Sequence, residues 1–281
     1  MIDKNGQSWY TKACILREQE AKEMADTKRV VVKVGTSTLT HDNGKVDLRK
    51  MEQLVRVLSE LMNMGLEVVL VTSGAISVGI GKLGMEQRPE STREKQALAA
   101  IGQVSLMALY EKFFREYGYG VGQVLLTKFI LDDEERYTNA RNAFETMIGY
   151  RVIPVVNEND VISTYEIEFG DNDTLSAYVA KVVEADLLVI LSDIDGFYNG
   201  DPKNPESRLL SVVEKITDEI RACAGGAGTR RGTGGMQTKL NAAELANDAG
   251  IDLVISNGKY PEKLYDIVKG ELVGTLFKGK K

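Results

Sequence analysis

The chain has 281 residues, of which 43% are hydrophobic, so it can bury the core of one large domain or two modest ones. It carries 35 Lys and Arg against 41 Asp and Glu, and the resulting net charge of −6 argues against nucleic acid and anionic membranes as partners. The sequence contains no apolar run of about 18 residues that would predict a membrane span, and two distant cysteines, Cys14 and Cys223, favour reduced thiols in a cytoplasmic protein.

Residues 1–28 contain no strong strand pattern, and we expect them to form an extension. From residue 29 onward, short apolar runs alternate with stretches of helical periodicity. The predicted strands cover residues 29–34, 67–72, 121–125, 151–156, 187–191, 209–213 and 252–256. The predicted helices cover residues 47–64, 93–117, 133–148, 173–184 and 235–249.

This alternation predicts an α/β protein in which residues 29–281 form one three-layer sandwich, with a mostly parallel central sheet covered by helices on both faces. Ligands of such sheets bind beyond the carboxyl ends of the strands. Polar and glycine-rich residues at those ends are therefore the candidates for function.

The first two predicted strands both end in residues suited to an anionic ligand. Lys33 lies inside the first strand, where burying its ammonium is costly unless a site of opposite charge is near. The alternative is an edge-strand lysine whose ammonium reaches water. The second strand runs into Thr72-Ser73-Gly74-Ala75 and a predicted helix, where small residues let backbone N–H groups approach an anion.

The segment Gly79-x-Gly81-x-x-Gly84 formally matches a dinucleotide-binding fingerprint. It begins seven residues past the strand rather than at the first turn. No strand ending in an acidic residue follows about 20 residues later, where the ribose contact belongs. We therefore do not expect a nicotinamide site.

The strand predicted at 151–156 is followed by Asn157-Glu158-Asn159-Asp160, and Gly170-Asp171-Asn172-Asp173 opens the next helix. Acidic residues at a helix start can simply cap its free N–H groups. The density of carboxylates and amides, however, favours recognition of an amino-acid ammonium group, magnesium, or both.

Two later segments are candidates for a nucleotide site. The strand at 187–191 runs into Ser192-Asp193-Ile194-Asp195-Gly196, for which a plain turn is the alternative. A glycine-rich loop at 225–235 leads into a helix that carries Lys239 near its start. Backbone donors of such a loop can hold a polyphosphate, with the lysine as a mobile charge, whereas a plain linker is the alternative.

Taken together and in this order, the segments resemble those of the glutamate 5-kinase family, within the amino-acid kinase superfamily. The matching motifs span residues 32–37, 71–76, 157–160, 170–173, 192–196 and 232–239. The resemblance implies the amino-acid kinase fold and ATP-dependent phosphorylation of the γ-carboxylate of L-glutamate to L-glutamyl 5-phosphate, the first step of proline biosynthesis.

The resemblance also implies roles for individual residues. Ser73, Asp160 and Asn172 would bind glutamate, and Lys33, Lys239 and Asp173 would form the catalytic group. Both lysines, with Mg²⁺, would neutralise the transferring phosphoryl group, while Asp173 orients their ammonium groups. No metal ligand is assigned. The expected ATP-binding residues are Lys33, Ser192, Asp193, Thr233, Gly234, Gly235, Met236, Gln237, Thr238 and Lys239.

Three departures from the family pattern accompany the match. We expect a short form without the C-terminal PUA domain of many members, the 28-residue extension has no counterpart, and Glu168 stands where lysine is expected. Expected partners are glutamate, ATP, proline as a feedback inhibitor, and a second copy of the chain in a dimer or tetramer. The alternatives are a kinase for another amino acid, such as acetylglutamate or aspartate, and a non-catalytic amino-acid sensor.

Overall fold

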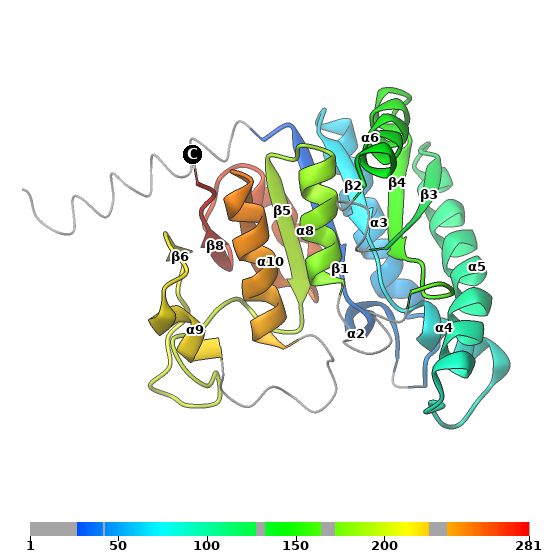
Figure 1. Cartoon of the computed structure of the whole chain (residues 1–281), viewed down its shortest axis with the longest axis horizontal. Coiled ribbons are helices and arrows are strands. Elements are labelled where there is room, and N and C mark those ends of the chain that lie inside the picture. The colour runs from blue at the N-terminus through cyan, green and yellow to red at the C-terminus, as the bar shows by residue number, and fades with distance from the viewer. Residues whose placement is uncertain (1–26, 42, 128–132, 164–171, 225–234, 281) are drawn as a thin grey trace, which may run out of the picture.

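The computed structural model describes residues 27–41, 43–127, 133–163, 172–224 and 235–280. Within these residues, eight strands form one sheet in the order β3-β4-β2-β1-β5-β7-β8-β6 (Figure 1). The strands are β1 Arg29–Val34, β2 Glu67–Val71, β3 Val121–Leu126, β4 Ile153–Glu158, β5 Leu187–Ser192, β6 Val212–Val213, β7 Asp252–Asn257 and β8 Thr275–Phe277.

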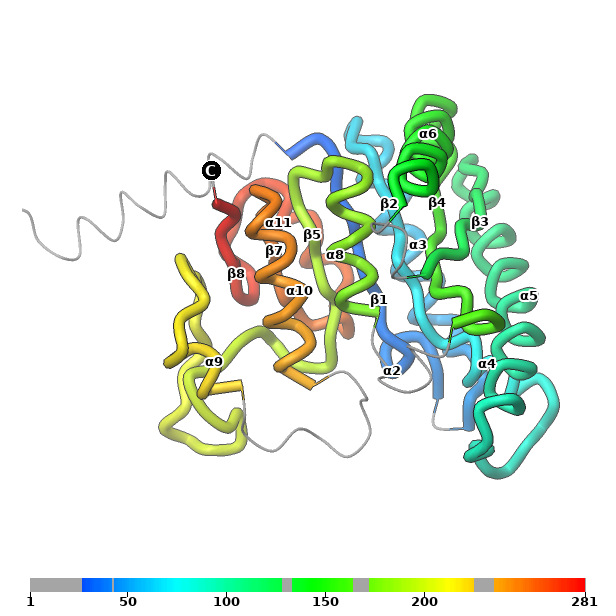
Figure 2. Tube along the Cα trace, in the orientation of Figure 1, coloured from blue at the N-terminus to red at the C-terminus, as the bar shows by residue number. Residues whose placement is uncertain are grey.

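The sheet is mostly parallel, as the sequence predicts. Among the described strands, β3, β4, β2, β1, β5 and β7 pair in parallel, as do β6 and β8, and only β7 and β8 pair antiparallel. Figure 2 shows β5, from the second half of the chain, lying beside β1 from its beginning. The carboxyl ends of the six parallel strands consequently meet at one edge of the sheet.

Helices cover both faces of the sheet. They are α2 Thr36–Leu39, α3 Leu48–Asn63, α4 Ala75–Leu83, α5 Thr92–Glu116, α6 Glu134–Gly149, α8 Asp173–Val182, α9 Asp218–Ala224, α10 Met236–Asp248, the 3₁₀ helix η2 Pro261–Lys263 and α11 Leu264–Ile267.

The alternation of side chains along β1 assigns these helices to two layers. Val30, Val32 and Val34 pack in one hydrophobic cluster with buried residues of α3, α5 and α11. Val31 packs in a second cluster with residues of α6, α8 and α10. Figure 1 shows α8 and α10 in front of the sheet and α3 behind it. The predicted three-layer α/β sandwich is confirmed.

Both predicted boundaries of β4 are two residues too early, since the strand was expected at 151–156 and spans Ile153–Glu158. Arg151 has a positive φ of 58°, and its N–H donates to the carbonyl of Ile148, so residue 151 still belongs to the turn that ends α6. At the other end, Asn157 and Glu158 pair with β3. Two polar residues that looked like a loop are therefore buried in the strand.

The prediction was also incomplete near the C-terminal edge of the sheet. Only Val212–Val213 of the stretch predicted at 209–213 forms a strand, and Leu209 makes an isolated bridge with Tyr198. The strand β8 and the short helices α2, α9 and α11 were not predicted, because three to seven residues are too few to show a period. The division between extension and domain stays a prediction, since residues 1–26 lie outside the described part.

The glycines of the rejected dinucleotide fingerprint serve close packing of α4. A Cβ at Gly79 would lie 2.2 Å from the carbonyl oxygen of Leu98 on α5, and one at Gly81 would lie 2.8 Å from the backbone of Gly44. Gly84 ends the helix with a φ of +64°. These glycines therefore let α4 pack closely between α5 and the turn that contains Gly44.

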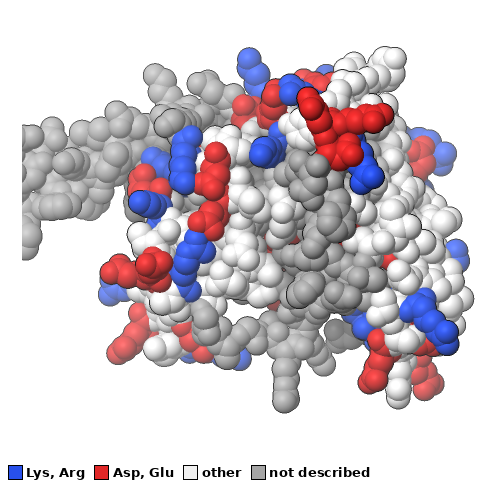
Figure 3. All heavy atoms as spheres, viewed as in Figure 1, with Lys and Arg blue, Asp and Glu red and all other residues white. Residues whose placement is uncertain are grey.

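On the face seen in Figure 3, basic and acidic side chains of the described residues are interspersed. Ion pairs also join different elements at the surface, such as Arg141 with Glu184 at 2.8 Å and Arg221 with Glu244. None of the helices in the described ranges is long and apolar enough to span a bilayer.

Candidate active site

The candidate site lies at the edge of the sheet where the parallel strands end. Lys33 is the fifth residue of β1, Thr72 and Ser73 follow β2, and Asn157 and Ser192 lie at the ends of β4 and β5. All five residues are at least nine-tenths buried. Their convergence follows from the parallel pairing, which brings four separate segments of sequence to one place.

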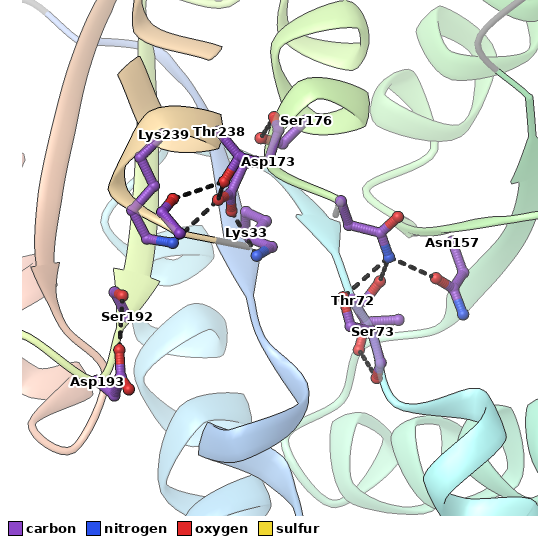
Figure 4. A network of polar contacts seen from close by, with 12 residues as sticks. Lys33, Thr72, Ser73, Asn157, Asp173, Ser176, Ser192, Asp193, Thr238 and Lys239 are labelled. Atoms are coloured by element: carbon purple, nitrogen blue, oxygen red, sulfur yellow. Dashed lines mark hydrogen bonds and ion pairs between the residues drawn. The ribbon is translucent and has the colours of Figure 1, made fainter. Parts of the chain in front are cut away.

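Lys33 points toward α8 and α10 because it lies two residues after Val31, on the same face of β1. There its Nζ lies 2.5 Å from Oδ1 of Asp173, the first residue of α8. The Nζ of Lys239, from the first turns of α10, lies 3.0 Å from Oδ2 of the same carboxylate (Figure 4). One carboxylate thus joins two ammonium groups from two different elements.

The electrostatics of this group favour an anionic ligand. Asp173 is completely buried, which alone opposes its ionisation, but the charges of Lys33 and Lys239 outweigh burial and hold the pKa of its carboxyl well below the usual range. Thr238 also donates to Oδ2 of Asp173, at 3.2 Å. The two ammonium groups and the one carboxylate give these three side chains together a net charge of +1.

The residue before Asp173 organises a second polar cluster. The Nδ2 of Asn172 lies 2.9 Å from the carbonyl oxygen of Thr72, 2.9 Å from Oγ of Ser73 and 3.0 Å from Oδ1 of Asn157. Its two hydrogens are shared among three acceptors. The Oδ1 of Asn172 is buried and has no hydrogen-bond partner in the described ranges. It is therefore available to accept a hydrogen bond from a ligand.

Asp160 lies just beyond β4 and is 4% exposed. Burial, and then the charge of Glu158, raise the pKa of its carboxyl to about 7, against a smaller opposing effect of Arg88. Asp160 and Glu158 line a pocket of about 240 Å³ together with residues of α4, α5 and β3, including Ala75 and Gln103. Buried acidic oxygens beside a pocket suit a cationic group.

The residues expected to bind ATP are only partly described. Ser192 ends β5, and its hydroxyl donates to Oδ1 of Asp193 at 3.2 Å. Gly235 is the N-cap of the 13-residue helix α10, so the first N–H groups of α10, beginning at Met236, have no acceptor within the helix. Gln237 donates to Asn241 along the same helix. Thr233, Gly234 and Glu168 lie outside the described residues.

The structure therefore brings the expected residues together in two groups. Lys33, Asp173, Thr238 and Lys239 form the charged group, and Ser73 and Asn172 belong to the amide cluster. Asp160 makes no hydrogen bond to either group among those described and lies at the neighbouring pocket. Among the residues that the structure describes, no three His, Cys, Asp or Glu side chains are placed to hold a metal ion.

Sequence reasoning did not assign a role to Thr72, Asn157 or Gln103. Asn157 was quoted only as part of a motif, and Gln103 was missed entirely. The signal for Gln103 was its position on α5, three residues before Leu106 and seven before Tyr110, both fully buried. A glutamine at helical spacing on an otherwise apolar face marks a buried polar contact.

Three comparisons relate this arrangement to known proteins. The family model described as the amino acid kinase family matches residues 28–257. A glutamate 5-kinase of Clostridium perfringens is 57% identical over 265 residues, which cover 92% of this chain and 98% of that protein. A glutamate 5-kinase of Clostridium tetani is 54% identical over 90% of this chain and 96% of that protein.

Relatives also differ in length. A glutamate 5-kinase of Thermoanaerobacter sp. is 52% identical over 89% of this chain, but the match covers 67% of that protein. Among solved structures, isopentenyl phosphate kinase of T. acidophilum gives a TM-score of 0.61 at 18% identity, over 89% of this chain and all of that one. Carbamate kinase of Giardia lamblia, bound to AMP-PNP, gives 0.63 at 16% identity, over 91% of this chain and 100% of that one. These two likenesses concern the fold.

Proposed function

This chain belongs to the amino acid kinase family and, within it, to the glutamate 5-kinases, and from that membership we propose that it transfers the γ-phosphoryl group of ATP to the side-chain carboxylate of L-glutamate. An oxygen of the γ-carboxylate attacks the γ-phosphorus, the bond to the β-phosphate oxygen breaks, and ADP leaves. The product is L-glutamyl 5-phosphate.

The observation that carries the proposal is the buried carboxylate of Asp173 between Lys33 and Lys239. Glutamate and ATP are both anionic, so the reaction depends on positioning and on neutralising charge. In our proposal the two ammonium groups bind oxygens of the transferring phosphoryl group, and Asp173 fixes their positions. The γ-carboxylate is ionised at neutral pH, so its attack requires no general base.

The amide cluster supports the binding of the acceptor. Ser73 and Asn172 lie next to the charged group, because Asn172 and Asp173 are consecutive residues at the start of α8. We assign Oδ1 of Asn172 and Oδ1 of Asp160 to the ammonium group of glutamate, since both oxygens are buried without a hydrogen-bond partner in the described residues. The charged group then faces the other end of the substrate.

The donor is ATP with Mg²⁺. In kinase sites Mg²⁺ is held by one or two carboxylates together with phosphate oxygens, and it neutralises part of the charge on those phosphates. The residues assigned to the nucleotide are Ser192, Asp193 and the N-terminal residues of α10, Gly235 to Lys239. Free N–H groups at the start of a helix of this length suit phosphate oxygens.

The assay that tests the proposal is release of ADP by the purified chain with ATP and Mg²⁺, in separate reactions with L-glutamate, L-aspartate or N-acetyl-L-glutamate. Glutamate alone should give rapid turnover. Faster turnover with another acceptor would show that the chain is an amino-acid kinase with a different substrate. Absence of turnover with every amino acid tried would instead indicate a non-catalytic amino-acid sensor.

Replacing Asp160 by alanine should raise the KM for glutamate by about 10- to 100-fold, because a charge-assisted hydrogen bond to the substrate ammonium contributes about 1.5–3 kcal/mol. The KM for ATP should stay within about twofold of the wild type. Calorimetric titration with each ligand separates the two effects. Equal weakening of glutamate and ATP binding would indicate a structural or metal-binding role.

The pKa of Asp160 adds a pH dependence to this expectation. Burial and Glu158 raise that pKa to about 7, so the carboxyl of the free enzyme gains negative charge as the pH rises from 6 to 8. Because the ionised form binds an ammonium group, the KM for glutamate should fall over that range. Asp160→Asn should have a higher KM that is flat with pH, and an equally steep profile in this variant would exclude Asp160 as its cause.

Proline should inhibit the enzyme in competition with glutamate. It offers the same α-carboxylate and a charged secondary amine but has no γ-carboxylate to phosphorylate, so it can occupy the groups around Asn172 and Asp160 without turnover. Initial rates at subsaturating glutamate over millimolar proline should fall, and excess glutamate should restore them. Inhibition that saturating glutamate leaves unchanged would place proline at another site.

The remaining parts of the proposal concern assembly and location. We assign the enzyme to the cytoplasm, where a free thiol such as that of Cys223 stays reduced. We assign it to a homo-oligomer, a dimer or a tetramer. Sedimentation equilibrium of the full chain measures the oligomeric state, and a monomer at all concentrations would contradict that assignment.

A further inference from the structure

Gln103 is the polar residue of α5 that reaches the amide cluster. It lies on the buried face of the helix and is 8% exposed. Its Oε1 accepts a hydrogen bond from Nδ2 of Asn157 at 2.9 Å, across 54 positions of sequence. A Cβ at the preceding residue, Gly102, would lie 1.8 Å from the carbonyl oxygen of Ala75, so the glycine lets α5 pack closely on the start of α4.

Three side-chain amides form a chain that begins at Gln103. Asn157 donates to Gln103 and accepts with its Oδ1 from Nδ2 of Asn172, at 3.0 Å. Asn172 in turn keeps its Oδ1 without a hydrogen-bond partner in the described ranges. This series of hydrogen-bonded amides therefore runs from an acceptor oxygen on α5 to an unpaired acceptor oxygen at the start of α8.

The donor-to-acceptor direction of these hydrogen bonds depends on Gln103. The Oδ1 of Asn157 also accepts from the backbone N–H of Glu158 at 3.0 Å, so its oxygen side faces two donors. The amine side of Asn157, in a residue only 1% exposed, faces the Gln103 oxygen. Removing that oxygen would leave a buried amine unpaired, which is costly and favours other orientations of the Asn157 amide. Asn172 would then lose the acceptor that helps hold its amine away from the ligand.

We propose that Gln103 is a positioning residue for the substrate ammonium group, acting through Asn157 on the orientation of Asn172. The inference rests on the proposed function, because it concerns the residues assigned there to glutamate. Gln103 hydrogen-bonds to Asn157 in the amide cluster, and α5 belongs to the layer opposite α10, which carries Lys239. Its loss should consequently affect glutamate binding and leave the nucleotide side unchanged.

The test is a kinetic cycle with Gln103→Met, Asn157→Ala and the double variant. Methionine has a similar length but cannot accept the hydrogen bond. Gln103→Met should raise the KM for glutamate about tenfold, as expected for a buried group left unpaired, with kcat and the KM for ATP within about twofold of wild type. The double variant should match the worse single variant, because both remove the same contact.

Two further variants serve as controls. Gln53→Met, on α3 and outside both polar groups of the site, makes the same chemical change and should leave all constants near wild type. Gln103→Glu keeps an acceptor oxygen opposite Asn157 and replaces Nε2, which has no hydrogen-bond partner in the described residues, by a second carboxyl oxygen in the pocket that Glu158 and Asp160 also line. It should keep the glutamate KM within about threefold of wild type even if the methionine variant folds poorly.

The inference is overturned if the two single effects multiply in the double variant, if glutamate and ATP are affected equally, or if Gln103→Met is folded and unchanged. The inference is also overturned if Gln103→Glu raises the KM for glutamate as much as Asn157→Ala does. Failure of the proposed function is a different result, since the wild-type chain itself would then release no ADP with glutamate.

Discussion

Replacing either Lys33 or Lys239 by alanine is expected to lower kcat by roughly 10²–10³, as observed when a preorganised group that stabilises transition-state charge is removed. Each lysine is more than nine-tenths buried and its ammonium is held by the same carboxylate, so it needs little reorganisation when the phosphoryl group transfers. The KM for glutamate should change by less than about threefold, because Asn172 and Asp160 remain in place.

Rapid-quench measurement of a single turnover separates this effect from slow product release. Lys181→Ala is the matched control, because Lys181 lies at the far end of α8 and is exposed. It should retain the wild-type rate. A folded Lys33→Ala or Lys239→Ala variant with near-normal kcat would remove that lysine from the charged group that acts in catalysis.

The second large effect is expected for Asp173→Asn. The change leaves two buried ammonium groups without their carboxylate, and breaking a buried ion pair in this way costs about 3–5 kcal/mol of unfolding free energy. Lys33 and Lys239 should also move apart, so kcat should fall at least as far as in the lysine variants. Urea unfolding and single-turnover rates on the same preparation measure both consequences.

The destabilisation caused by Asp173→Asn should depend on pH. The two lysines hold the pKa of Asp173 below its unfolded value, so the stability that it contributes is fully present above about pH 4 and is lost as the pH falls further. The difference between Asp173→Asn and wild type should therefore shrink at low pH. Asp248→Asn, which removes an exposed partner of Lys280, should cost less than about 1 kcal/mol, and an equal cost at both positions would contradict the buried pair.

The sequence predicted elements best where local pattern and tertiary environment agree. The run of valines in β1 gave both of its bounds correctly, because every second residue meets a helix layer on one face of the sheet. At β4 the local pattern was misleading, since Asn157 and Glu158 are polar but buried, and their pairing with β3 decides the end of the strand.

The charged group of the site could be anticipated for a similar reason. Lysine inside an apolar strand demands a partner, and an aspartate at a helix start supplied one. The contact between Gln103 and Asn157 could not be anticipated, because helical spacing shows that a glutamine is buried but not which strand end it meets. Tertiary packing of α5 against β4 alone decides that partner.

The two polar groups of the site are joined by a single peptide bond. Asn172 and Asp173 are adjacent, yet the side chain of Asn172 reaches β4 and the residues that follow β2, while that of Asp173 reaches β1 and α10. This bond therefore fixes the distance between the two groups, which the proposed function assigns to glutamate and to the transferring phosphoryl group. Thermal movement of α8 carries both groups together, so their separation is preserved. Each residue turns a helix by about 100°. Adding or deleting one residue between Asn172 and Asp173 would therefore point one of the two side chains away from its partners. Insertions should be tolerated before or after this pair but not between its members.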